Sequence, residues 1–397
     1  MIWQAVHIVE WVLWCLIAVS VIYVIVFSAV SVFCKKRMLS SCPSADSKLP
    51  LTDFLVIFPA YHEDEVIRHS VAKFLEQSYP TSHYQVVVVS DHMQAETNRW
   101  LSEQSLMLVC PTFQKSSKAK ALQAAMKACR EWKADSYARR VVILDADNVV
   151  EENFLYRLNS LCQHTDAFIQ CHRTAKNSDN NIAALDGVSE EINNTIFRRA
   201  HNQIGLSSAL IGSGMCFDFQ WFCSHVDNLS TAVEDRELEA IILREGLFVY
   251  YAEDIPVYDE KVSSGDNFQR QRLRWMTGQV QALFMMMPYL PKAFRKCNVD
   301  YIDKTLQQAL LPRSILLSVL PIVAILISLV CWQWGFKWWA LLGAFLVALI
   351  AAIPYRLRSR ALFRHAIALP SLTWRMICNL FRINKKNTDF IHTTHNK

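Results

Sequence analysis

The sequence predicts an open α/β domain, built on a mixed, mostly parallel sheet flanked by helices and inserted between membrane-spanning helices. Between Asp53 and Cys171 short apolar strands alternate with helical stretches, and polar residues gather where the strands end. Sheets of this kind bind ligands in the crevice beyond the carboxyl ends of their strands. Uncharged apolar runs of about 20 residues, the length needed to cross a bilayer, lie before and after this region.

The composition agrees with a membrane protein that has a soluble part. Hydrophobic residues make up 52% of the 397 residues and charged residues only 19%. The net charge of +5 is concentrated beside the apolar segments, which favours anionic lipid surfaces as partners and argues against nucleic acid. The 12 cysteines show no CxxC pair, which indicates reduced thiols in a cytosolic compartment and no structural zinc.

The first apolar run, Trp11–Phe33, contains no charged residue, and the basic cluster Lys35-Lys36-Arg37 follows it. A cleaved signal peptide carries its basic residues before the apolar run, so an uncleaved anchor fits the sequence better. Basic residues beside a span remain in the cytoplasm, which predicts that Met1 lies outside.

Two further spans are expected at Ser314–Phe336 and Trp338–Tyr355. Tryptophans gather where these two runs meet, as expected of an aromatic belt at the membrane surface. They are Trp332, Trp334, Trp338 and Trp339. The arginines from Arg356 to Arg360 then return the chain to the cytoplasm.

The chain is therefore expected to have six parts. They are a membrane anchor (1–37), a linker (38–50), a cytosolic α/β domain (51–283), interfacial helices (284–313), a transmembrane hairpin (314–355) and an interfacial segment with a cytosolic tail (356–397). Phe284–Pro291 is apolar but too short and too interrupted by proline to span. Ala361–Ile383 mixes apolar residues with arginines and is expected to lie on the membrane.

The α/β domain is expected to contain five strands, followed by a mostly helical region after about Asn177. The strands are Phe54–Phe58, which ends at Pro59, then Gln85–Val89, Leu106–Val109, Val141–Leu144 and Phe168–Cys171. Helices are expected at about residues 65–77 and at Lys115–Trp132. No GxGxxG or Walker lysine motif is present, so neither a dinucleotide fold nor a P-loop fits.

Two carboxylates, Asp145 and Asp147, follow the strand Val141–Leu144 directly. Unpaired charge in a core is too costly, so these residues are expected to share an open cleft. Carboxylate oxygens suit Mg²⁺ or Mn²⁺, and Mg²⁺ usually joins a few carboxylates to substrate phosphates. The alternative is an ordinary strand end with solvated turn residues, because Asp-x-Asp alone is common.

Three later segments can likewise be explained either by a function or by structure alone. Gly212-Ser213-Gly214-Met215 is a segment where glycines allow close approach to a ligand or to another element. Asp235 falls in the first turn of a helix opening at Ala232 and running to Arg244, and a carboxylate is favourable there even without a catalytic role. The helix Gln269–Gln281 carries three arginines and one tryptophan, which would also suit a basic face on lipid headgroups.

Taken in order, these motifs resemble the family 2 glycosyltransferases. The motifs are Pro59-Ala60-Tyr61-His62-Glu63-Asp64, Asp91, Lys118-Ala119, Asp145-Ala146-Asp147, Glu234-Asp235 and Gln271-Arg272-Leu273-Arg274-Trp275. The chain looks most like the membrane-embedded branch that includes hyaluronan, chitin, poly-N-acetylglucosamine and cellulose synthases. The resemblance covers roughly Leu51 to Gln281 and implies a GT-A fold with inverting transfer from a nucleotide sugar.

The resemblance also implies roles for individual residues. Asp147 would hold a divalent metal, Mg²⁺ or Mn²⁺, together with Asp145, which also faces the nucleotide. Asp235, preceded by Glu234, matches the catalytic base. The remaining positions are Tyr61, Glu63, Asp91 and Lys118 for the nucleotide sugar, Arg272 and Arg274 for its phosphates, and Gly212, Ser213, Gln271 and Trp275 for the acceptor.

The sequence departs from the family pattern at three points. Ser90-Asp91-His92 stands where many relatives have paired aspartates, and Val233 where they have threonine. Three spans are also fewer than most chain-secreting relatives have, so export is expected to need self-association or a separate partner.

The expected function is inverting transfer, from a UDP-sugar to a saccharide acceptor, by an enzyme of the plasma or inner membrane with its catalytic domain in the cytoplasm. Elongation of an exported polysaccharide is the leading interpretation. Single-sugar transfer to a lipid-linked acceptor, or a catalytically inactive scaffold, are the alternatives. A transporter is disfavoured because the expected spans hold almost no ionisable residues.

Overall fold

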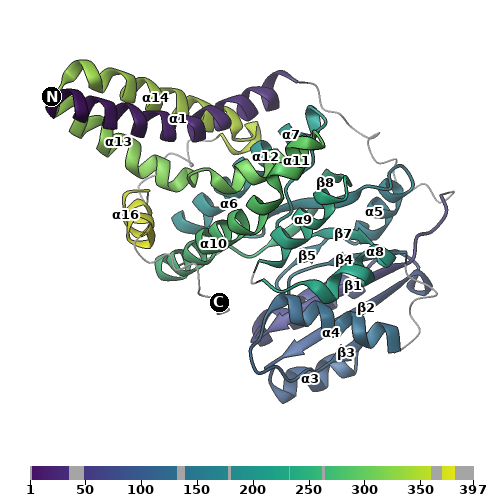
Figure 1. Ribbon diagram of the computed structural model, residues 1–397. Coiled ribbons are helices and arrows are strands. Elements are labelled where there is room, and N and C mark those ends of the chain that lie inside the picture. Colours follow the sequence, from purple (N-terminus) through teal and green to yellow (C-terminus); the bar gives the residue numbers. More distant parts are fainter. Residues whose placement is uncertain are drawn as a thin grey trace.

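A computed structural model describes residues 2–34, 49–131, 139–177, 180–231, 233–261, 264–358 and 369–380. An α/β domain occupies one end of the molecule and a bundle of three long helices the other (Figure 1). The expected linker 38–50, except its last two residues, and the tail after Leu380 lie outside the described residues.

The domain is built on a sheet that has eight strands in the described part of the chain, in the order β3-β2-β1-β4-β7-β6-β8-β5. The parallel half comprises β1 (Phe54–Tyr61), β2 (Tyr84–Asp91), β3 (Met107–Val109) and β4 (Arg140–Ile143). In the other half, β7 (Met215–Asp218) runs antiparallel to β4 and to β6 (Phe168–Ala175). β6 pairs in parallel with β8 (Val249–Asp259), and β5 (Val149–Val150) pairs antiparallel with β8 at the edge. The predicted mixed sheet is confirmed.

Helices cover both faces of the sheet, because the central strands are apolar on both sides. One face packs against α2 (Asp64–Leu75), α3 (Ala95–Ser102) and α5 (Phe154–Cys162). The other packs against α4 (Lys118–Glu131), α8 (Phe219–His225) and α9 (Glu234–Arg244). The short segments η1 (Thr81–His83) and η4 (Val226–Asn228) join these elements.

Strand β1 differs from the expectation, because it continues through Pro59 to Tyr61. The ladder between β1 and β4 ends at Ile57 and Ile143, while the ladder with β2 runs on to Tyr61 and Asp91. The Ile57 carbonyl accepts from the Leu144 backbone N–H on the β4 side of β1. Pro59, two residues later, faces the same side of β1, beyond the point where the pairing with β4 ends. A proline costs no ladder hydrogen bond there.

The region after Asn177 is less helical than expected, since β7 and β8 complete the sheet. β7 is only four residues long, and β8 alternates apolar residues with glutamate, aspartate and tyrosine. Neither segment forms the continuous apolar run by which the other strands were recognised. Their pairing partners lie far away in the sequence, so only the assembled sheet reveals them.

The bundle consists of α1 (Ile2–Phe33), α13 (Arg313–Val330) and α14 (Trp332–Ala352), each long and apolar enough to cross a membrane. The turn between the last two lies at Cys331, earlier than the predicted junction near residue 337. Trp338 is therefore inside α14 and fully buried, where its indole donates to Glu10 Oε1 at 2.5 Å. The expectation that Trp338 belongs to an aromatic belt is wrong, because hydropathy does not mark a turn between two apolar helices.

Glu10 and Lys337 are two ionisable residues inside these long helices, and their side chains pair at 2.7 Å. Glu10 falls within α1 because this helix starts well before the expected span. Pairing neutralises both charges at one place, so the pair is suited to joining α1 to α14. The described spans hold no chain of such groups.

Several helices connect the bundle to the sheet. α6 (Asn181–Asn193) continues through the π-helical η3 (Asn194–Arg199) into α7 (Ala200–Gln203), and η3 and α7 pack against α1. α10 (Gly265–Met286) is followed by η5 (Met287–Tyr289), α11 (Leu290–Arg295) and α12 (Val299–Ala309). After η6 (Tyr355–Leu357), α16 (Leu369–Leu380) packs against α10 and α13.

Helix α12 connects the membrane helix α1 to the α/β domain through buried polar groups. The Tyr23 hydroxyl of α1 donates to Asp303 Oδ1 at 2.7 Å and lies 2.8 Å from His201 Nε2. Gln307 Nε2 donates to Asp303 at 2.8 Å. Buried hydrogen-bonded networks have specific geometry, so this cluster fixes where α1 meets the domain.

Candidate active site

A cavity of about 440 Å³ opens at the carboxyl ends of β1, β2 and β4 and continues to the candidate membrane helices α1 and α13. The cavity is lined by most of the residues singled out from the sequence. Those residues are Tyr61, Glu63, Asp91, Lys118, Asp145, Asp147, Gly212, Glu234, Asp235, Gln271, Arg272, Arg274 and Trp275. The structure therefore brings together groups that lie up to 214 residues apart in the chain.

The Asp145-Ala146-Asp147 turn is fixed by hydrogen bonds with the side chains of Asn148 and Ser213. The Asp145 backbone N–H donates to Asn148 Oδ1 at 3.0 Å and to Ser213 Oγ at 3.2 Å. The Ser213 hydroxyl in turn donates to Asn148 Oδ1. Because these bonds fix the turn, the two carboxylates project beyond β4 at defined positions.

Ser213 was expected at the acceptor side, and the structure places its side chain elsewhere. The residue is fully buried and hydrogen-bonded beneath the aspartate turn, so its side chain is closed to a ligand. Gly212 does line the cavity. A Cβ built on Gly212 would lie 3.7 Å from Asp235 Oδ2, and the φ of +81° also favours glycine. Gly212 thus keeps open the space in front of the two acidic residues of α9.

Lys118 lies at the centre of the site, at the first residue of α4. Its ammonium donates to Asp145 Oδ1 and to the Gly212 carbonyl at 2.6 Å, and lies 3.6 Å from Glu234 Oε1. Burial would lower the pKa of Lys118, but the carboxylates of Asp145 and Glu234 outweigh burial and raise the pKa. Lys118 is therefore a fixed positive charge between the aspartate turn and α9.

Asp147 lies deeper in the site and is only 6% exposed. It accepts from Asn148 Nδ2 at 3.1 Å and from the Glu260 backbone N–H at 3.3 Å. Burial raises the pKa of Asp147 well above its usual range, and the carboxylates of Asp259 and Asp145 raise it further, against Arg173. Among the described residues, its hydrogen-bond donors are a side-chain amide and a backbone N–H, so no ion pair compensates its charge.

A divalent cation fits a buried carboxylate that has no ion-pair partner among the described residues. The described residues contain no group of three or more histidine, cysteine, aspartate or glutamate side chains arranged to hold a metal. Mg²⁺ and its relatives accept such a sparse protein site, because they take one or two carboxylates and complete their shell with substrate phosphates and water. Asp147 and Asp145 are the residues that would hold the ion.

The acidic residues of α9 have different surroundings. Glu234 is 7% exposed, and burial is the main cause that raises its pKa to about 7. Asp235 is half-buried at the cavity wall, where its Oδ1 accepts from the Arg236 backbone N–H at 2.8 Å. Of the two, Asp235 presents its carboxylate to the space where an acceptor hydroxyl could lie.

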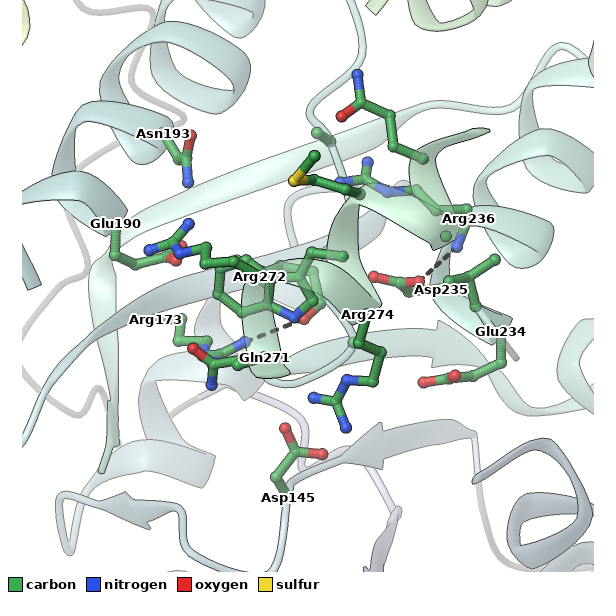
Figure 2. Close-up of a pocket in the computed structure, with 18 of the residues that line it drawn as sticks. Asp145, Arg173, Glu190, Asn193, Glu234, Asp235, Arg236, Gln271, Arg272 and Arg274 are labelled. Atoms are coloured by element: carbon green, nitrogen blue, oxygen red, sulfur yellow. Dashed lines mark hydrogen bonds between the residues drawn. The ribbon is translucent and has the colours of Figure 1, made fainter. Parts of the chain in front are cut away.

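Helix α10 sends its two motif arginines in different directions (Figure 2). Positions 272 and 274 are about 200° apart around a helix of 3.6 residues per turn. Arg274 points towards Asp145 and Glu234. The carboxylates of these two residues stabilise its positive charge more than any other charged group does. Arg272 extends instead towards Glu190 and pairs with Asp186 of α6. Only Arg274 thus lies beside the aspartate turn, as expected of a phosphate-binding residue.

Trp275 lines the cavity, and the Arg272 guanidinium lies 4.4 Å from its ring centroid. A guanidinium over an indole face forms a cation–π contact that holds both side chains in place. Gln271 also lines the cavity, and its Oε1 is buried without a hydrogen-bond partner among the described residues. Figure 2 shows Gln271 and Arg272 above Asp145.

The proposed nucleotide end is formed by the last residues of two neighbouring strands. Tyr61 and Asp91 are paired in register at the ends of β1 and β2. Asp91 is 2% exposed and lies 2.6 Å from His92 Nδ1. Both His62 and His92 have positive φ, so each strand turns sharply directly after its paired residue. Glu63 follows the first of these turns and faces the cavity.

Several lining residues carry no sequence signal. Asp259, at the end of the unpredicted β8, pairs with Arg173 at 2.6 Å and with Lys261 at 2.7 Å. Residues of the membrane side were also missed, among them Ser20 and Val24 of α1 and Arg313 at the start of α13. Their place at the cavity depends on how helices pack together, which local sequence does not report.

A family profile described as "Glycosyltransferase like family 2" matches residues 50–278, more than half of the chain. The chain belongs to this family. A search of curated proteins finds no match. The enzyme class predicted from the motifs is thus confirmed as glycosyltransferase.

The chain is also similar to solved glycosyltransferase structures. The mannosyltransferase PcManGT from Pyrobaculum calidifontis, solved in complex with GDP-Man and Mn²⁺, is 18% identical, with a TM-score of 0.55 over 86% of this chain and 97% of that chain. TarS 1-349 from S. aureus is 14% identical, with a TM-score of 0.45 over 83% of this chain and 91% of that chain. The first likeness confirms that the mixed sheet is GT-A-like.

Proposed function

We propose that this family 2 glycosyltransferase performs inverting transfer of a sugar from a nucleotide sugar to an acceptor hydroxyl at the membrane surface. The observation that carries the proposal is one continuous cavity, with the aspartate turn at one end, Asp235 in its wall and the membrane helices at the other. The donor would occupy the end with Tyr61 and Asp91, with UDP as the nucleotide. The acceptor would enter from the membrane side.

In the proposed reaction the acceptor oxygen bonds to C1 of the donor sugar while the bond from C1 to the phosphate oxygen breaks. Asp235 takes the proton of the attacking hydroxyl from the face opposite the leaving group, and a nucleoside diphosphate departs. Positive charge on C1 and negative charge on the diphosphate grow together, so fixed cations near the leaving group lower the barrier. Lys118 and Arg274 supply that charge.

Asp147 and Asp145 would hold Mg²⁺ or Mn²⁺, which when bound supplies Lewis-acid stabilisation to the leaving diphosphate. A metal-bound relative of similar fold, PcManGT with Mn²⁺, supports this assignment. Lys118 keeps Asp145 oriented through its hydrogen bond. Glu234, buried against Lys118, balances the charge of that lysine and is not exposed enough to meet an acceptor.

We favour elongation of an exported polysaccharide, as in the synthase branch that the Gln271–Trp275 motif resembles. A stacking platform such as Trp275 grips any terminal sugar alike, so each product can serve as the next acceptor. Three spans cannot enclose a hydrated polymer, whose polar groups must not face lipid unsatisfied. Export would then need self-association or a separate partner.

Single-sugar transfer to a lipid-linked acceptor is the second candidate, and one observation favours it. The membrane end of the cavity is walled by Val24, Leu310, Leu311 and Met376, which offer an apolar surface. A lipid tail is suited to such a wall. Both candidates share the catalytic groups and differ in how many sugars are added.

The test is to incubate the purified protein with a panel of nucleotide sugars and to measure release of nucleoside diphosphate, with Asp235→Asn as the matched control. We expect release from one donor, strongest from a UDP-sugar, and at least about 100-fold less from the variant. No release above the variant from any donor would support an inactive scaffold instead. Sizing the products then separates the two candidates, because only mono-glycosylated lipid at every donor concentration contradicts elongation.

A further inference from the structure

The cavity does not end at the catalytic groups but reaches the membrane helices. Its far wall includes Ser20 and Val24 of α1, both inside a helix long and apolar enough to span. Leu310 and Leu311, just before α13, and Met376 of α16 add apolar side chains to that wall, and Gln279 and Gln307 add polar ones. A ligand that reached from Asp235 to this wall would need a polar part and an apolar part.

Arg313 faces the cavity at the boundary between these two parts. It is the first residue of α13, and its Nη2 donates to the Ser189 carbonyl at 3.0 Å and to Asn193 Oδ1 at 2.6 Å. Among the described residues no carboxylate lies within ion-pair distance of its guanidinium. Its hydrogen-bond partners are neutral, so they orient the guanidinium without cancelling its charge.

The charged groups around Arg313 leave an excess of positive charge. Two guanidinium groups, Arg272 and Arg198, and one carboxylate, Glu190, are the charged groups that act most strongly on it. Arg272 is already paired with Asp186, and Arg198 is paired with Glu190 at 3.2 Å. Among the described residues of this cluster, three guanidinium groups thus share two carboxylates. A partly buried cation left over in this way is costly unless a ligand supplies the missing anion.

We infer that Arg313 binds a phosphate group of an amphiphilic acceptor, placed between the membrane and the catalytic site. This inference rests on the proposed function and names the substrate class of the same site. A guanidinium offers a planar fork of donors that matches phosphate oxygens. The apolar wall beyond Arg313 is suited to the acyl or alkyl part of the same molecule.

The phosphate is held as an anchor and does not act as the nucleophile. A phosphate monoester is already ionised and needs no base to attack, whereas Asp235 stands ready to take a proton from a hydroxyl. The attacking hydroxyl therefore belongs to a sugar that lies between Arg313 and Asp235, along Gln271 and Trp275. The acceptor class is a saccharide joined through phosphate to a lipid.

Binding is measured first, with radiolabelled dodecyl phosphate as the probe and the full-length protein in neutral-lipid nanodiscs. Wild-type protein should bind the probe, and Arg313→Gln should weaken binding at least about tenfold. Arg313→Lys keeps the charge and should lie between the two. Arg295→Gln is the matched control, because it removes the same charge from an exposed position on α11 outside the cavity and should leave binding within about twofold.

Competition identifies the source of the phosphate. Unlabelled dodecyl phosphate should displace the probe, whereas inorganic phosphate and neutral dodecyl glucoside should not at equal concentration. If inorganic phosphate displaced the probe at equal concentration, the site would bind a free anion, and the inference of an amphiphilic ligand would be wrong. Equal binding to wild type and Arg313→Gln would overturn the role of Arg313.

Kinetics separate this inference from the proposed function. With a glycosyl dodecyl phosphate acceptor, Arg313→Gln should raise the acceptor KM about tenfold or more and leave the donor KM within about twofold. A raised donor KM would instead assign Arg313 to the nucleotide diphosphate. If wild-type protein transfers sugar from no donor to any acceptor, the proposed function fails; transfer with no preference for phosphate-bearing over neutral acceptors defeats only the inference.

Discussion

At the scale of single residues, the site is built from a few charges held in fixed positions around one glycine. Gly212 leaves room for Asp235 and Glu234 on one side and for Lys118 on the other. The Lys118 ammonium donates hydrogen bonds both to the Asp145 carboxylate and to the Gly212 carbonyl. The donor-side and acceptor-side carboxylates therefore share one lysine, and their roles should still be separable by mutation.

Asp147→Asn and Asp235→Asn should affect different steps. In the proposed site Asp147 is an ionised metal ligand, so Asp147→Asn should lower metal-dependent donor binding at least about tenfold. Asp235→Asn removes only the proton acceptor, so donor binding should stay within about twofold while transfer falls about 100-fold or more. Donor affinity by equilibrium binding, with and without Mn²⁺, and transfer rate at saturating donor check both. Equal loss of donor binding in the two variants would contradict the division of labour.

Glu234 predicts how stability depends on pH. Burial raises the pKa of Glu234 to about 7, above the ordinary value near 4.5. Between pH 4.5 and pH 7 the folded state therefore keeps a proton on Glu234 that the unfolded state has lost. Its contribution to stability is present at low pH and disappears as the pH rises towards 7. Glu234→Gln removes this dependence. The thermal midpoint of the variant in detergent with chelator should therefore gain on wild type from pH 5 to pH 7.

The expected gain is at most about 1.4 kcal/mol of unfolding free energy for each pH unit in that window. Below pH 4.5 and above pH 8 the difference between the two proteins should stay constant. If the thermal midpoints of wild type and Glu234→Gln changed in parallel from pH 5 to pH 8, the predicted effect of burial on Glu234 would be wrong. Glu103→Gln, which removes an exposed carboxylate directly after α3, on the opposite face of the sheet from α9, serves as the control.

At the scale of elements, the contact between α9 and α10 sets the distance between the base and the arginine motif. Gly278 of α10 packs directly against Val233, the residue before Glu234, and a Cβ at position 278 would come within 2.3 Å of Val233 Cγ1. The valine that replaces the usual threonine is thus packed against the motif helix. The two helices approach closely only because position 278 has no side chain.

Gly278→Ala should push α10 away from α9. Overpacking of this kind costs about 1–3 kcal/mol, and the displaced Arg274 should lower transfer at least about tenfold. Val233→Ala removes the clashing methyl groups, so the double variant should recover most of the activity. The measurement is kcat with saturating donor for the two single variants and the double variant. Failure of Val233→Ala to rescue Gly278→Ala would show that the contact does not control the site.

The sequence allowed prediction of elements whose signal is local. β1, β2 and β4 are valine- and isoleucine-rich because they are buried on both faces, and that composition is visible without any partner. β7 and β8 were missed because their partners, and not their own residues, make them strands. Trp338 was misplaced for the same reason, since its burial depends on the contact with α1.

The same distinction applies to the site. Asp145, Asp147 and Asp235 could be predicted because they stand in short motifs at a strand end and a helix start. The opposite directions of Arg272 and Arg274 follow from helical geometry only once the face of α10 is known. Arg313 and the support that Ser213 gives the aspartate turn required the packed structure, because each depends on a residue far away in the chain.

At the scale of the whole molecule, the α/β domain is attached to the membrane bundle on the side where the cavity opens towards α1. The Tyr23–Asp303 bond and the packing of α16 on α10 and α13 fix the two parts together. An acceptor drawn from the membrane would then reach Asp235 without crossing bulk water.

The proposed function, with its donor supplied from the cytoplasm, predicts one topology, with Met1 and the Cys331 turn outside and the α/β domain in the cytoplasm. Single cysteines at the exposed positions Glu103 and Gln333, in a cysteine-depleted background, test it in intact cells. A membrane-impermeant reagent should label Gln333→Cys and leave Glu103→Cys unlabelled until the cells are opened. Labelling of Glu103→Cys in intact cells would reverse the orientation.

The most direct test of the account is the configuration of the bond that the enzyme forms. A single displacement with Asp235 as base must attack C1 from the face opposite the leaving diphosphate. Nuclear magnetic resonance of the product made by purified wild-type protein from an α-configured nucleotide sugar should therefore show a β linkage. An α linkage from the same donor would contradict inverting transfer through Asp235.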